Sequence, residues 1–354
     1  MSSRSLRRRG RVPVMAFLGV ALLGAALFSL HAGALKIPLE EVAQLLWARA
    51  SGAPPEASPF EAVLWSLRLP RLLFGLLVGG TLSVAGALMQ GLFRNPLADP
   101  GLIGVSSGAA LGAVTIIVFG TAFFPGVSWL GDLRWLPVAA FVGALLVTML
   151  VQGIATVGGF TAVAMLLLAG IAMNAIVVAV IGVSTFMASD LQMRTLSFWT
   201  LGSLGAATWE TLALASPFCL GLLLLAPFFA PGLNAMALGE AEAEHLGFSV
   251  ERIKRIMVVA TAAGVGVCVA FTGLIGFIGL VVPHLVRLLL GPDHRWVIPG
   301  SALLGAILLT VADTASRTLV APAEMPIGIL TAAFGGPFFL AMLFGQRRNI
   351  LGRS

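Results

Sequence analysis

Two long stretches without a single charged residue constrain the fold of this chain more than any other feature. One covers residues 72–93 and the other covers residues 135–189. A continuous helix over the second stretch would extend about 80 Å at 1.5 Å per residue, whereas the hydrocarbon core of a bilayer is about 30 Å thick. The second stretch must therefore fold back once, and Val157-Gly158-Gly159 is the natural turn. Further charge-free stretches cover 211–239, 256–286, 296–312 and 325–346.

Composition indicates that lipid, not water, surrounds most of this surface. Only 10% of the residues are charged, compared with about 25% in soluble domains. The 42 glycines fit the same interpretation, because helices in lipid pack through small residues that let their backbones approach. Gly104, Gly108 and Gly112 recur on one helix face, as do Gly75 and Gly79. We expect these faces to pack against neighbouring helices.

We therefore predict an all-α integral membrane protein with one transmembrane domain over residues 1–354. Charges and turn residues divide the chain into ten helices. The predicted spans are 13–33, 64–92, 101–122, 135–156, 161–186, 209–230, 254–272, 274–290, 296–318 and 327–345.

The distribution of basic residues predicts the orientation. Ten spans place both termini on one side of the membrane. That side would hold 14 of the 21 lysines and arginines, and the other side would hold 7. Because cytoplasmic segments are enriched in Lys and Arg, we expect both termini to be cytoplasmic.

The N-terminus also has features of a cleavable signal peptide. Arg7-Arg8-Arg9 precedes a long apolar stretch, and Ala32-Gly33-Ala34 follows it. An apolar stretch of about twenty residues is long for a signal peptide and right for a span. We expect the segment to be retained as the first span.

The chain lacks the usual means of converting energy. Its only lysines are Lys36 and Lys254, and neither follows a glycine-rich phosphate-binding loop. An ion-coupled secondary transporter would need titratable groups near the membrane midplane, and the predicted spans offer almost none. A membrane enzyme would need a catalytic cluster of His, Asp and Glu, and none is visible in the sequence. If transport is uphill, its energy must enter through a partner.

One polar segment on the expected cytoplasmic side could receive that partner. Residues 236–255 read MALGEAEAEHLGFSVERIKR, which predicts a short helix, a glycine turn and a basic second helix. Glu240 and its acidic neighbours crowd the first turn, where the helix dipole favours anions. An ordinary solvated loop is the alternative interpretation of this segment.

Three further motifs have both structural and functional interpretations. Asn95 through Gly101 contains two prolines that break the helix, so it is either part of a gate or a rigid turn. Arg68 and Arg71 precede a span, as interface anchors or as a dock for an acidic partner. Asp313 and Arg317 are four residues apart and can pair.

Together these motifs resemble the permease subunits of the ABC importers for ferric siderophores, heme and cobalamin. The matching stretches follow the order of the family along most of the chain. They are Leu67–Arg71, Gln90–Gly104, Trp199–Ser203, Gly239–Gly247, Gly273–Arg287, Asp293–Arg295 and Glu324–Gly328.

The resemblance implies a homodimer of ten-helix subunits in the bacterial inner membrane. Two cytoplasmic ATPase subunits would bind below it and a periplasmic binding protein above it, so the chain itself would be no enzyme. No permanently bound cofactor and no nucleic-acid partner are implied, and ATP would be used by the partner subunit.

The family match also implies roles for particular residues. Binding-protein docking would fall to Arg68, Arg71 and Arg317. Coupling to the ATPase, through helices at 236–252, would fall to Gly239, Glu240, Ala241, Leu246 and Gly247. The gates would be Asn95 and Leu97 at one position and, through a looser match, Phe160 and Thr161 at another.

The cargo is predicted from one segment. Asp190–Arg194, followed by Phe198 and Trp199, is similar to the heme-importing members. Arg194 would face a propionate at the outer end of the fifth span, a match of arginine with carboxylate. The same architecture importing a ferric siderophore or cobalamin is the alternative.

Overall fold

The structure is a computed structural model that describes residues 10–52, 58–123 and 133–351. The basic triplet Arg7-Arg8-Arg9, noted above as a feature of a signal peptide, lies outside these ranges. The described chain is almost entirely helical. Its elements are α2 (Arg11–His31), α3 (Leu39–Ala50), α4 (Pro59–Val63), the π-turn η1 (Leu64–Arg68), α5 (Leu69–Leu92), the 3₁₀ turn η2 (Pro100–Ile103), α6 (Val105–Phe123), the 3₁₀ turn η3 (Leu133–Trp135), α7 (Leu136–Ala155), β1 (Thr156–Val157), β2 (Phe160–Thr161), α8 (Val163–Phe186), α9 (Asp190–Leu201), α10 (Trp209–Met236), α11 (Glu240–His245), α12 (Val250–Thr272), α13 (Ile278–Leu290), α14 (His294–Thr318) and α15 (Ile327–Leu351).

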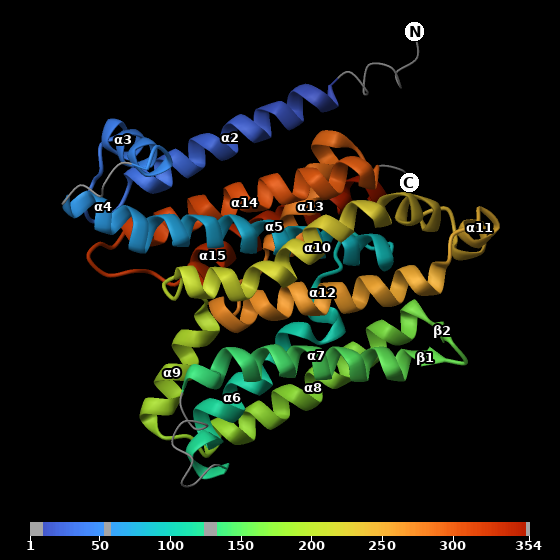
Figure 1. Ribbon diagram of the computed structural model, residues 1–354. Helices are drawn as coiled ribbons and strands as arrows, with labels where there is room; N and C mark the ends of the chain where they lie inside the picture. Colours follow the sequence, from blue (N-terminus) through green and yellow to red (C-terminus); the bar gives the residue numbers. More distant parts are fainter. Residues whose placement is uncertain (1–9, 53–57, 124–132, 352–354) are drawn as a thin grey trace.

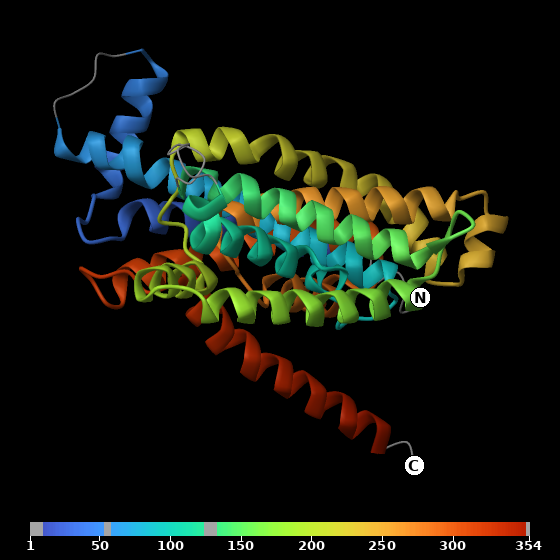
Figure 2. The ribbon, with the colours of Figure 1, turned by 90° about the horizontal axis from the view of Figure 1, so that it is seen from below.

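The long helices run roughly side by side in one bundle (Figure 1). One end of the bundle carries α3, α4 and α9, and the opposite end carries α11 and the β1–β2 hairpin. We call these the α3 end and the α11 end. The helix α2 begins and α15 finishes at the α11 end, and α15 leans away from the other helices (Figure 2).

Seven of these helices are long and apolar enough to cross a membrane, and α5 is the most enclosed of them. Shorter apolar stretches occur at Val105–Gly120, Ile278–Leu290 and Ile327–Ala341. The predicted all-α membrane class is therefore confirmed. The number of membrane crossings and the side on which the termini lie stay predictions.

Glycine faces pack closely, as the sequence predicts. A Cβ atom at Gly108 would overlap the backbone oxygen of Gly143, and one at Gly112 would overlap that of Ala139. These contacts join α6 to α7. On the central helix, a Cβ atom at Gly79 would overlap the backbone oxygen of Gly305 in α14.

The predicted turn within the long charge-free stretch is also confirmed. Thr156 and Val157 pair with Thr161 and Phe160 in a two-residue antiparallel ladder. Gly158 and Gly159 close the hairpin with φ values of +60° and +87°. Positive φ at both central positions is typical of the type I′ turn, which glycine adopts at little cost.

Several predicted helix ends differ from the structure; α10, for example, continues to Met236 instead of ending at residue 230. The segment expected as a helix from residue 274 is not helical until Ile278, because Gly273 and Phe277 have φ values of +69° and +67°. The basic second helix expected after the glycine turn is no separate element. It is the first turn of α12, so the segment 236–252 contains only one complete helix of its own, α11.

Candidate functional site

At the α3 end, the three arginines predicted for docking lie around one pocket of about 580 Å³. Arg71 is the centre of the ion pairs there. Its Nε donates to both carboxylate oxygens of Asp313 at 2.9 and 3.2 Å, and its terminal nitrogens hold both oxygens of Glu324 at 2.9 Å. Arg71 is thus held by two carboxylates from its own chain.

Arg317 shares one of these acids and also contacts the end of α2. Its Nε donates to Asp313 at 3.1 Å, so the predicted pairing of these residues is confirmed. Its terminal nitrogens reach Oγ of Ser29 at 3.1 Å and the carbonyl of Ala32 at 3.3 Å. Asp313, only 3% exposed, therefore bridges two arginines.

Arg68 is more buried than expected for a side chain that anchors a helix at the membrane interface. It is 6% exposed and donates to the backbone carbonyls of Leu30, His31 and Leu35. The last carbonyls of a helix have no partner within it and attract cations. Arg68 therefore caps the C-terminal end of α2 in this structure.

This group, which we call the outer arginine cluster, consists of Arg68, Arg71, Arg317, Asp313 and Glu324. Three cations face two carboxylates, so it keeps a positive excess. Glu324 lies between α14 and α15, and its hydrogen bond with Arg71 holds the pKa of this carboxyl below its usual range. Its side chain is 47% exposed, which makes this pair the accessible one.

At the α11 end, Lys254 connects a predicted coupling residue, Glu240, to a residue of the second predicted gate, Thr161. Lys254 Nζ donates to Glu240 at 2.6 Å and to the backbone oxygen of Thr161 at 2.9 Å. Phe160, beside Thr161 in the hairpin, is 68% exposed. The exposed tip of this region includes Leu246 and Gly247, and Gly247 has a φ of +87° that closes the turn after α11.

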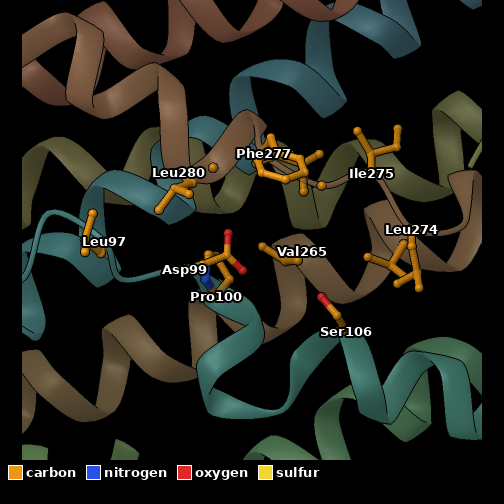
Figure 3. A pocket seen from close by; sticks show the side chains of 13 residues that line it. Leu97, Asp99, Pro100, Ser106, Val265, Leu274, Ile275, Phe277 and Leu280 are labelled. Atoms are coloured by element: carbon orange, nitrogen blue, oxygen red, sulfur yellow. The ribbon is translucent and has the colours of Figure 1, made fainter. Parts of the chain in front are cut away.

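The first predicted gate lies beside a partly open cavity of about 330 Å³ (Figure 3). Asn95 Oδ1 accepts from the amide of Leu97 at 2.9 Å, which shapes the turn after α5. Leu97 lines the cavity together with the non-helical segment before α13 and part of α12. Asn95 itself is exposed and does not line the cavity.

Asp99 also faces this cavity, and sequence reasoning did not select it. Figure 3 shows its carboxylate pointing toward the segment that carries Phe277 and Leu280. One oxygen accepts from the amide of Gly101 at 2.8 Å and caps η2. The sequence did contain a signal for Asp99, since it is the only charged residue between Arg94 and Asp132.

Comparison with known proteins identifies the family. The FecCD transport family matches residues 21–345, which is most of the chain. The chain belongs to the FecCD transport family.

FecCD relatives match along nearly their whole length. The chain is 44% identical to the hemin transport system permease protein HmuU of Yersinia pestis, over 96% of this chain and 97% of that protein. It is 38% identical to the vitamin B12 import system permease protein BtuC of Salmonella typhimurium, over 97% of this chain and 98% of that protein. A solved metal-chelate type ABC transporter in an inward-facing conformation covers 94% of this chain at 29% identity, with a TM-score of 0.80. The match includes 99% of the chain of that transporter. The expected resemblance to importer permeases is confirmed.

The FecCD match does not by itself assign the cargo residue. Arg194 lies on α9, a helix that the sequence did not predict, and its side chain is exposed. Figure 1 places α9 at the α3 end, away from the β1–β2 hairpin. Arg194 is therefore distant from the second predicted gate, and its contact with cargo stays a prediction.

Proposed function

We propose that this chain is the permease subunit of an ATP-binding-cassette importer that carries heme from the periplasm to the cytoplasm. The observation that carries the proposal is the 44% identity to a hemin transport permease over 96% of the chain. Two features support it independently: a cationic cluster at one end of the bundle, and an exposed short acidic helix at the other.

In this proposal the α3 end faces the periplasm and the α11 end faces the cytoplasm of a bacterium, in the inner membrane. Ten helices cross the bilayer, with the seven long ones joined by α6, α13 and α15. Both termini are cytoplasmic, in keeping with the excess of basic residues on that side. Two copies form the translocation path, and two ATPase subunits contact α11 of each copy.

The outer arginine cluster would receive the binding protein. Arg71 and Arg317 would exchange Glu324 and Asp313 for carboxylates of that protein, which conserves the number of ion pairs. Arg68 would have to release the carbonyls of α2 before it could pair with a partner. A positive excess at the docking face also speeds encounter with an acidic protein.

Transport would proceed by alternating access. ATP binding in the partner subunits favours one conformation, and the cargo moves because its affinity differs between the two conformations. Leu97, with Asn95 in the same turn, and the Phe160-Thr161 hairpin would close the path toward the cytoplasm. Arg194 at the periplasmic end would attract a heme propionate.

The test is uptake into vesicles that contain the chain with and without its ATPase. Heme uptake that requires both ATP and the ATPase supports the proposal. Uptake driven by an ion gradient without the ATPase contradicts it and would direct attention to Asp99 as a titratable group.

The cargo is tested by comparing heme, cobalamin and a ferric siderophore in the same vesicles. Stronger uptake of cobalamin would favour the function named for the vitamin B12 relative. Arg194→Ala should weaken heme uptake more than uptake of a siderophore that lacks carboxylates. Equal losses would remove the role of Arg194 in recognising propionate.

A further inference from the structure

Lys254 is almost completely buried and uses every hydrogen it can donate. The side chain is 2% exposed. Its ammonium donates to Glu240 at 2.6 Å, to Glu251 at 2.9 Å and to the backbone oxygen of Thr161 at 2.9 Å. An ammonium has three donors, so the three contacts satisfy the group completely.

Lys254 and Glu251 together hold both backbone polar groups of one residue. Glu251 accepts from the amide of Thr161 at 2.7 Å through one oxygen, while its other oxygen accepts from Lys254. The Thr161 hydroxyl also lies 3.0 Å from that of Thr156 in the paired strand. The hairpin is thereby fixed to the first turn of α12.

The same ammonium fixes α11 to this site. Glu240 is the first residue of α11, and its contact with Lys254 is the ion pair that joins that helix to the α12 turn. Thr161 precedes the start of α8 by two residues. A single side chain therefore connects α11, the beginning of α12 and the beginning of α8.

We infer that Lys254 is a positioning residue that transmits displacement of α11 to the β1–β2 hairpin and to α8. The inference rests on the proposed function, in which α11 contacts the ATPase. Beyond that function, the inference names Lys254 as the connection between α11, where the ATPase binds, and the gate at Phe160-Thr161. The stability of the fold does not by itself require a buried lysine here, because buried ion pairs can often be replaced by apolar residues of similar volume without loss of stability.

The first experiment measures the connection in the full chain alone, in nanodiscs. Spin labels at Phe160→Cys and Leu246→Cys occupy exposed positions, whereas Cys219 and Cys268 are fully buried. We expect a narrow distribution of distances between the labels in the parent protein. Glu240→Gln should broaden the distribution, because it weakens only the contact with α11.

Glu244→Gln is the matched control, since it makes the same charge change on the same short helix at an exposed position. It should leave the distribution narrow. Lys254→Met should broaden it at least as much as Glu240→Gln. An unchanged distribution in both Glu240→Gln and Lys254→Met would overturn the inference.

The second experiment measures heme uptake per ATP hydrolysed in the complex with the ATPase. In Glu240→Gln we expect uptake per ATP to fall by about tenfold relative to the matched Glu244→Gln variant, a usual size for coupling between sites. The melting temperature should stay close to that of the parent, so that loss of fold does not explain the result. A parallel fall in ATP turnover and uptake would overturn the inference.

The outcome separates this inference from the proposed function. ATP-driven uptake by the parent protein, with uptake per ATP unchanged in Glu240→Gln, would reject Lys254 as the connection and keep the importer. No ATP-driven uptake by the parent would reject both.

Discussion

At the scale of single residues, Asp313 and Glu324 both neutralise arginines of the outer arginine cluster, but in different surroundings. Asp313 is buried and bridges two arginines, while Glu324 is half exposed and serves Arg71 alone. The two carboxylates therefore contribute different amounts to the free energy of unfolding.

Asp313→Asn should destabilise the protein more than Glu324→Gln. Removing one partner of a buried ion pair costs about 3–5 kcal/mol, whereas exposed pairs contribute about 0–1 kcal/mol. Thermal unfolding of the two variants in the same detergent measures the difference. Equal shifts would show that Arg71 and Arg317 find other partners.

Acid should remove the contribution of Glu324. Its pKa in the folded protein lies below its ordinary value because of the hydrogen bond with Arg71. A carboxyl of this kind contributes stability above the pKa of the unfolded chain, and the contribution disappears as the pH falls through the folded pKa. The stability difference between the parent and Glu324→Gln should therefore be largest near neutral pH and vanish at low pH. A difference that persists in acid would contradict this origin.

At the scale of elements, the packing of α6 on α7 depends on backbone contact at glycine. The two helices approach so closely at Gly108 and Gly143 that each added Cβ atom would overlap an opposing carbonyl. Gly153, on the same α7, has no such neighbour within 4 Å.

Gly108→Ala should lower the stability, and Gly153→Ala should leave it unchanged or raise it slightly. Overpacking costs about 1–3 kcal/mol, while replacing an unhindered helical glycine by alanine gains about 0.5–1 kcal/mol. Unfolding midpoints of the two variants provide the comparison. A similar response at both sites would mean that α6 and α7 separate easily.

Breaks in helices were harder to predict than the helices themselves. Charge-free stretches indicated where helices lie, since only apolar residues suit a lipid environment. The break was predicted at Gly273 alone, and its continuation to Phe277 was missed because residues 274–277 are as apolar as a helix and the left-handed φ at Phe277 is not visible in composition.

At the scale of the whole molecule, the two ends of the bundle differ in the chemistry that they present. The α3 end holds the outer arginine cluster, and the α11 end holds the Lys254 contacts. The cavity beside Leu97 and Asp99 lies within the bundle between them. In the proposed function, this arrangement would allow the path to be controlled from both ends.

Glu324→Gln should strengthen docking of an acidic binding protein several-fold, because Arg71 then keeps only one internal carboxylate. Surface plasmon resonance with the chain in nanodiscs measures the affinity, and rising salt should weaken it. Glu40→Gln is the control, since Glu40 is an exposed acid of α3 at the same end. An equal gain in both variants would indicate a general charge effect and no specific competition by Glu324.

The sequence by itself determined the class of this protein. Charge-free stretches, ordered motifs and the lack of a phosphate-binding loop follow from local composition and spacing, so they could be read without coordinates. The i, i+4 pair of Asp313 and Arg317 was predictable for the same reason. Only the tertiary structure decided which distant residues meet. It brought Arg71 to Glu324, turned Arg68 onto the end of α2, and placed Lys254 on Thr161, because such contacts depend on how helices pack and not on their neighbours in the chain.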